Sequence, residues 1–198
     1  MDAFNIYMVG AGGQGIGLLS EIILRAGDQA GLPVKGVDIH GLAQRGGIVK
    51  SQIRIGRNAH SPLIPEDAAD LALALERHEA LRALKLALKD GGSLAYYNAV
   101  WQSPDVRSGR AEEVDARTLD EEARLRNISV FNVFDPQLAD ARMQNMVMLA
   151  VIAGNGLVPG IGPDDYRQAM EDLMTGTMLY RNQALFERNF HDENRVCR

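Results

Sequence analysis

The glycine-rich turn Gly10-Ala11-Gly12-Gly13-Gln14-Gly15 is the feature that most constrains what this chain can fold into. An apolar run over residues 5–9 leads into the turn, and a helical pattern over residues 16–30 leaves it. Glycine suits this place because the chain must reverse tightly and because a ligand can approach bare backbone there. The following helix turns its free N–H groups and positive dipole end toward the turn, which favours a phosphate.

The rest of the chain alternates strand and helix patterns and then becomes helical. Strands are expected at residues 4–9, 34–39, 48–55, 69–75, 93–98 and 128–133, with a turn at residues 90–92. Helices are expected at residues 16–30, 76–88, 118–126, 137–142, 145–153, 166–174 and 177–190. Thr118 is the expected cap of the helix over residues 118–126, and Asp164 or Asp165 that of the helix over residues 166–174. We therefore expect one domain over residues 1–198: a three-layer, Rossmann-like α/β fold with a mainly parallel sheet and a helical C-terminal third.

Composition narrows the class of protein. The formal net charge of −5 argues against a general role in nucleic-acid or membrane-surface binding. No apolar run is long enough for a transmembrane helix, and we expect no signal peptide. The lone cysteine, Cys197, fits a reducing cytoplasm and excludes a self-contained iron–sulfur cluster, which needs about four thiolates. The four histidines lack metal-ligand spacing, so no intrinsic metal site is expected.

The glycine turn by itself admits two interpretations. Gly10, Gly12 and Gly15 satisfy the pattern G-x-G-x-x-G, and Asp38 follows near the end of the second predicted strand. That arrangement is typical of a dinucleotide site in which the acidic residue binds the adenosine ribose. The alternative is a tight strand–helix turn that binds nothing. Gln14 can both donate and accept a hydrogen bond at the start of the helix.

A second polar and glycine-rich segment covers residues 40–47, His40-Gly-Leu-Ala-Gln-Arg-Gly-Gly. Its Gly-Gly pair allows a sharp turn, and Arg45, Lys50 and Arg54 are candidates to present cations near the first turn. Lys50 and Arg54 can equally be ordinary exposed strand residues. His40 lacks a nucleophile beside it, so a structural role is favoured over acid–base catalysis.

Three further features have both a functional and a structural interpretation. The Met-rich stretch that begins at Asn145 is either a partner surface or, as we favour, core; Asn145 is a candidate helix cap. Asn98 either reaches the crevice or holds a turn, and Trp101 either anchors a partner subunit or covers the core. No nucleophile elbow, Walker lysine or Cys–His pair is present, so no catalytic machinery is visible.

Together the motifs resemble a known family. Residues 10–15, residues 40–47 and Ser51-x-Ile-Arg54 are similar to the gamma domain of the 2-oxoacid:ferredoxin oxidoreductases. Residues 61–65, 69–76 and 79–82 continue the likeness, which extends to Asn98 and to Asn145 with its helix. The likeness is greatest to the indolepyruvate type, in which this domain is a separate chain, the beta subunit.

The resemblance implies a non-catalytic subunit of an enzyme that converts an aryl 2-oxoacid and coenzyme A to acyl-CoA and carbon dioxide while reducing ferredoxin. Thiamine diphosphate and iron–sulfur clusters would belong to a larger partner subunit. This chain would contribute to coenzyme A binding and assembly. The implied binding residues are Gly10, Gly12, Gly13, Gln14, Gly15, Gln44, Arg45, Gly46 and Gly47.

Two other functions stay open at this point. One is an NAD-dependent oxidoreductase, and the other is an assembly module without a small-molecule ligand. The sequence also leaves open which 2-oxoacid is used, whether isolated chains form a homodimer, and what Asp38, His40, Lys50 and Trp101 do.

Overall fold

The computed structural model describes residues 3–40, 47–100, 113–190 and 196–197. Seven strands form one sheet in the order β2-β3-β1-β4-β5-β6-β7. Their bounds are β1 Phe4–Ala11, β2 Val34–His40, β3 Ile48–Ile55, β4 Ala69–Ala74, β5 Leu88–Tyr97, β6 Ser129–Val133 and β7 Val196–Cys197. The helices are α1 Ile16–Gln29, α2 Arg77–Leu86, α4 Ala116–Leu125, the 3₁₀ turn η1 Ala141–Met143, α5 Gln144–Gly154, α6 Pro163–Leu173 and α7 Gly176–Phe190.

The sheet is mainly parallel in direction, as predicted. Strands β1, β4, β5 and β6 pair in parallel, while β3 pairs antiparallel with both β1 and β2. Strand β2 therefore runs in the same direction as β1 without touching it. The predicted strand, helix and strand over residues 4–39 form the unit β1–α1–β2, but β3 is inserted between its two strands.

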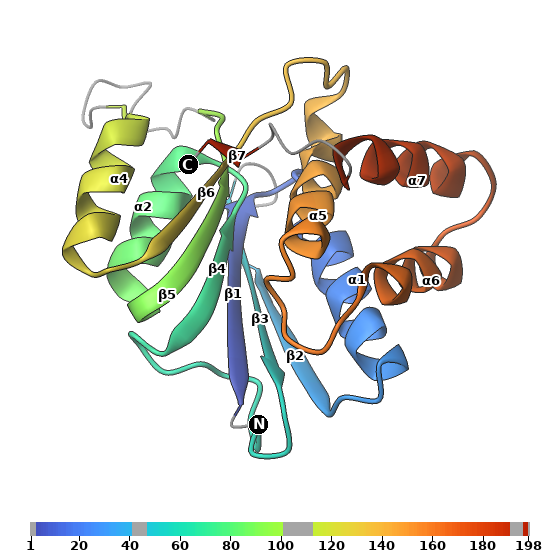
Figure 1. The fold of residues 1–198 in the computed structure, drawn as a ribbon, viewed down its shortest axis with the longest axis horizontal. Helices are drawn as coiled ribbons and strands as arrows, with labels where there is room; N and C mark the ends of the chain where they lie inside the picture. The colour runs from blue at the N-terminus through green and yellow to red at the C-terminus, as the bar shows by residue number, and fades with distance from the viewer. Residues whose placement is uncertain (1–2, 41–46, 101–112, 191–195, 198) are drawn as a thin grey trace.

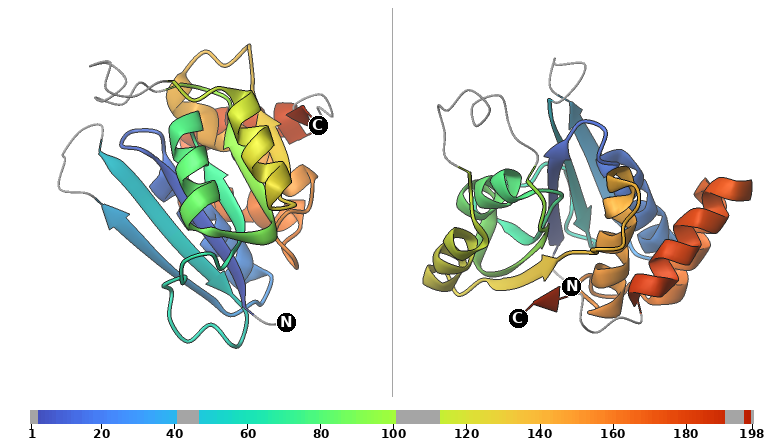
Figure 2. Two further views of the ribbon diagram at one scale, coloured as in Figure 1. Left: turned by 90° about the vertical axis from the view of Figure 1, so that its left-hand side faces the viewer. Right: turned by 90° about the horizontal axis from the view of Figure 1, so that it is seen from above.

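Helices cover both faces, which confirms the three layers (Figures 1 and 2). Helices α1, α5, α6 and α7 pack on one face, and α2 and α4 pack on the other. Strand β1 shows why: Ile6 and Met8 enter the first core, and Tyr7 and Val9 enter the second. Nearly all of α5 is buried, so the Met-rich stretch is core.

Several local predictions need correction. The turn expected at residues 90–92 lies inside β5, as an irregularity in its register with β4. Asp115 rather than Thr118 caps α4, because its carboxylate accepts the Thr118 N–H. Gly162 rather than an aspartate is the N-cap of α6, with Asp165 accepting the Gly162 N–H.

The stretch from 137 to 142 is not a full helix, because only the short turn η1 forms there. Strand β7 was not expected from the sequence. It adds antiparallel to β6 at one edge of the sheet.

Candidate functional site

The glycine turn lies where two neighbouring strands lead to helices on opposite faces of the sheet. Strands β1 and β4 are parallel neighbours, yet β1 leads to α1 on one face and β4 leads to α2 on the other. In open α/β sheets, ligands bind at the carboxyl ends of strands where the connections diverge in this way. The topology thus places residues 10–15 at the expected position of a site.

Backbone conformation and close contacts explain why the turn needs glycine. Gly13 has φ +98° and Gly15 has φ +80°, values that favour glycine. A Cβ at Gly10 would lie 2.7 Å from Gln14 Oε1, and a Cβ at Gly15 would lie 2.4 Å from Asn145 Nδ2. The prediction that glycine is required for tight reversal is confirmed at these positions.

The two glycine segments meet, as the sequence led us to expect. The Gly12 N–H donates to the Gly47 carbonyl over 2.8 Å. Gly47 is the one binding residue predicted in the second segment that the structure describes. Gln44, Arg45 and Gly46 lie outside the described residues, as does Trp101, and their predicted roles stay predictions.

The Gln14 side chain is held inside the protein. It is fully buried, its Oε1 accepts the Ala11 N–H at 2.7 Å, and its Nε2 donates to the Leu75 carbonyl at 3.3 Å. Gln144, also buried, donates to the same carbonyl at 2.8 Å. Both side chains form hydrogen bonds at the ends of β1 and β4, so Gln14 shapes the turn, and its predicted role in ligand binding stays a prediction.

Asn145 connects the turn to α5. Its Nδ2 donates to the Gly15 carbonyl at 3.2 Å, and its Oδ1 accepts the Met146 N–H. It is therefore not the helix N-cap that the sequence suggested, since Met143 occupies that position. Asn98 holds a turn: its Oδ1 accepts from Arg77 Nε at 2.6 Å.

A shallow hollow of about 420 Å³ opens beside the turn. Its lining is mostly backbone and small side chains, contributed by Ala11, Gly13, Gly15, Ile16, Gly17 and Val49. Gly15 is the N-cap of α1, and no side chain caps that helix start. The first N–H groups of a helix have no partner within the helix and carry its positive dipole end. The hollow can therefore accept an anion through backbone N–H groups.

The other predicted polar residues lie away from this hollow. Arg54 pairs with Asn5 at the opposite end of β1 and donates to the Asn5 side chain, so it cannot reach the turn. Asp38, on β2, accepts a hydrogen bond from the Ser51 hydroxyl on β3, and β3 separates β2 from β1. Lys50 points toward α2, where its charge acts on Glu79, whereas the hollow lies on the α1 face.

A buried acidic group at the start of α2 was missed from the sequence. The Glu76 carboxylate caps α2 by accepting the His78 and Glu79 N–H groups. Burial raises the pKa of Glu79, and it also raises the pKa of Tyr7 nearby. Glu79 Oε2 and His78 Nε2 are buried, and no described residue forms a hydrogen bond with either atom. Two glutamates three positions apart, at a strand–helix junction, were the available signal.

Neither a metal-binding cluster nor a membrane-spanning helix is found among the described residues. In that part of the chain no three histidine, cysteine or acidic side chains gather as a metal site would require. Nor does any helix described here have the length and apolar character needed to cross a bilayer.

Comparison with known proteins adds the following. Residues 5–191 match the protein family described as pyruvate ferredoxin/flavodoxin oxidoreductase. The sequence is 34% identical over 182 residues to the indolepyruvate oxidoreductase subunit IorB of Archaeoglobus fulgidus, covering 90% of this chain and 89% of the relative.

Solved structures share the fold. The pyruvate oxidoreductase subunit PORC of Thermotoga maritima superposes with a TM-score of 0.67 at 19% identity, covering 97% of both chains. The 2-oxoglutarate:ferredoxin oxidoreductase of Magnetococcus marinus, solved with 2-oxoglutarate, coenzyme A and succinyl-CoA, gives a TM-score of 0.65 at 18% identity. That match covers 100% of this chain and 33% of the longer one.

Proposed function

This chain belongs to the pyruvate ferredoxin/flavodoxin oxidoreductase family, and from that membership we propose that it is the non-catalytic subunit of an indolepyruvate-type 2-oxoacid:ferredoxin oxidoreductase. In this proposal it supports the oxidative decarboxylation of an aryl 2-oxoacid and contributes to coenzyme A binding and to assembly of the complex. The isolated chain is inactive. The lone cysteine, which cannot form a disulfide within the chain, favours a cytoplasmic location.

The observation that carries the coenzyme A assignment is the hollow at the start of α1. It offers backbone N–H groups, a positive dipole end and no acidic lining residue. Those features match a pyrophosphate or a 3′-phosphate. The adjoining Gly47 leads back into residues 44–46, where we propose that Arg45 completes the site.

The chemistry is assigned to a larger partner subunit. An iron–sulfur cluster needs about four thiolates, and this sequence has one cysteine. We therefore propose that thiamine diphosphate and the clusters are held by the partner, through which ferredoxin is reduced. The indole-type specificity rests on the Archaeoglobus relative.

The geometry disfavours an NAD-dependent oxidoreductase. In a dinucleotide fold the second strand lies beside the first, so that its acidic residue reaches the ribose. Here β3 separates β2 from β1, and Asp38 is engaged by Ser51. Gln14 and Gln144 also fill the crevice between β1 and β4.

Co-expression with the candidate large subunit tests the proposal. We expect a stable complex that oxidises indolepyruvate only when both chains and coenzyme A are present. Calorimetry of the complex with coenzyme A and with NAD separates the alternatives. Binding of NAD but not of coenzyme A would favour the NAD-dependent dehydrogenase. A coenzyme A affinity that no substitution in the glycine turn changes would favour an assembly module without a small-molecule ligand.

A further inference from the structure

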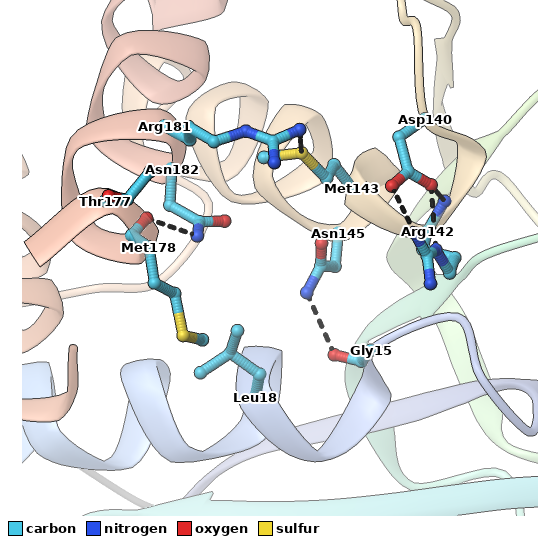
Figure 3. Close-up of a pocket in the computed structure, with 10 residues that line it drawn as sticks. All are labelled: Gly15, Leu18, Asp140, Arg142, Met143, Asn145, Thr177, Met178, Arg181 and Asn182. Carbon is cyan, nitrogen blue, oxygen red and sulfur yellow. Dashed lines mark hydrogen bonds and ion pairs between the residues drawn. The ribbon is translucent and has the colours of Figure 1, made fainter. Parts of the chain in front are cut away.

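We propose that the chain has a second small-molecule site, in the hollow between α1, α5 and α7, which binds a small apolar 2-hydroxy acid. Gly15 lines this hollow as well as the one beside the glycine turn, but the proposal rests on other residues than the coenzyme A assignment. The hollow has a volume of about 590 Å³, within the range of about 300–1,000 Å³ seen for ligand pockets. Figure 3 shows side chains from the three helices and from η1 around one open space.

The hollow carries one cation without a carboxylate partner. Asp140 is engaged by Arg142, whose Nε and Nη2 donate to it over 3.0 and 2.8 Å. Arg181 forms no ion pair with any described residue and donates weakly to the Met143 sulfur at 4.0 Å, and its charge adds to the Arg142 hydrogen bonds that lower the pKa of Asp140. Two arginines against one aspartate leave a surplus of one positive charge. An anion is the ligand that this charge favours.

Beside Arg181 lies an amide acceptor that points into the same space. Asn182 is 8% exposed, and its Nδ2 donates to the Met178 carbonyl at 2.8 Å. That bond orients its Oδ1 toward the hollow, where no described residue donates to it (Figure 3). An amide oxygen that no described residue engages can accept a hydrogen bond from a ligand that carries an O–H or N–H group.

The remaining wall is apolar. Leu18, Met143 and Met178 line it, and Met178 is 51% exposed. Methionine side chains adapt to irregular shapes and contact aromatic rings favourably. Because Arg181 and Asn182 are consecutive, the ligand's anion and its donor should also be close neighbours. A carboxylate with an adjacent hydroxyl and an apolar body meets these conditions, whereas an α-amino acid would add an ammonium to a positive site.

Calorimetry of the full-length chain with 3-phenyllactate tests the proposal, with 3-phenylpropanoate and L-phenylalanine as matched ligands. We expect saturable binding of 3-phenyllactate with a Kd below about 5 mM. Loss of the hydroxyl in 3-phenylpropanoate should weaken binding about fivefold, the value of one hydrogen bond. Absence of saturable binding, equal affinity of 3-phenylpropanoate, or tighter binding of L-phenylalanine would overturn the proposal.

A pair of variants locates the site. Arg181→Met keeps an unbranched apolar stem and removes the guanidinium charge, so it should weaken 3-phenyllactate binding about tenfold. Arg117→Met removes an exposed cation from α4, on the far face of the sheet, and should leave binding unchanged. Equal affinities for both variants would refute the site, and the comparison of ligands on the unaltered chain remains decisive if a variant does not fold.

Discussion

Replacing Gly17 by glutamate should stabilise the protein and at the same time weaken coenzyme A binding. Gly17 is the second residue of α1 and lines the hollow beside the turn. A Cβ built there meets nothing within 4 Å, so a side chain fits without a clash. Glutamate is a better helix former than glycine, and a negative charge in the first turn of a helix interacts favourably with its dipole. The two effects together should raise the free energy of unfolding by about 1 kcal/mol.

The same charge opposes a phosphate at the helix start. At a separation of about 5 Å and an effective dielectric constant of about 20, two unit charges repel by about 3 kcal/mol. Exposure to solvent reduces this figure, so we expect coenzyme A to bind about tenfold more weakly, equivalent to about 1.4 kcal/mol. Stability and affinity should therefore change in opposite directions.

Gly17→Gln is the matched control, because it has the same shape without the charge. Calorimetry of the assembled complex with coenzyme A should give a ratio of affinities between the two variants that shrinks as salt is added. Equal affinities of the glutamine and glutamate variants would refute an anion site at the start of α1. A glutamate variant that unfolds at a lower temperature than the parent would refute the placement of Gly17 itself.

Further changes test the turn and the buried acid. Gly15→Ala should cost about 2 kcal/mol of unfolding free energy in urea titrations, because Gly15 has a positive φ and an added Cβ would clash with Asn145. Gly13 also has a positive φ, but an added Cβ meets nothing there, so Gly13→Ala should cost about 1 kcal/mol. Equal losses in the two variants would contradict this explanation. Gln14→Glu should cost about 3 kcal/mol of unfolding free energy in the same assay, because it places a buried carboxylate against the Leu75 carbonyl. An unchanged stability would show that the Gln14 side chain is not buried in this way. Burial raises the pKa of Glu79 in the folded state, so ionisation of Glu79 destabilises the fold once the pH exceeds the pKa that this group has in the unfolded chain. Glu79→Gln should therefore raise the melting temperature more at pH 8 than at pH 4. An equal gain at both pH values would refute this reasoning.

Much of this protein follows from local sequence pattern. A strand was predicted over residues 48–55, and in β3 Ser51 and Ile53 share the buried face while Lys50 and Gln52 share the other, as strand alternation requires. The glycine turn, the helix after it and the buried Met-rich stretch were likewise readable, because periodicity and backbone freedom are properties of neighbouring residues. The same local signals were less reliable at helix starts, where Asp115 and Gly162 displaced the expected caps.

Strand order and side-chain partners were decided by the tertiary structure alone. No pattern in residues 34–55 states that β3 inserts antiparallel between β1 and β2, yet that insertion separates Asp38 from the turn and sends Arg54 to the far end of the sheet. Nor could the sequence show that Gln14 meets Leu75, because a hydrogen bond across 61 positions depends on how β1 and β4 align. Local residues determined that a bare-backbone turn exists, and the packing of distant elements determined which of its groups face outward.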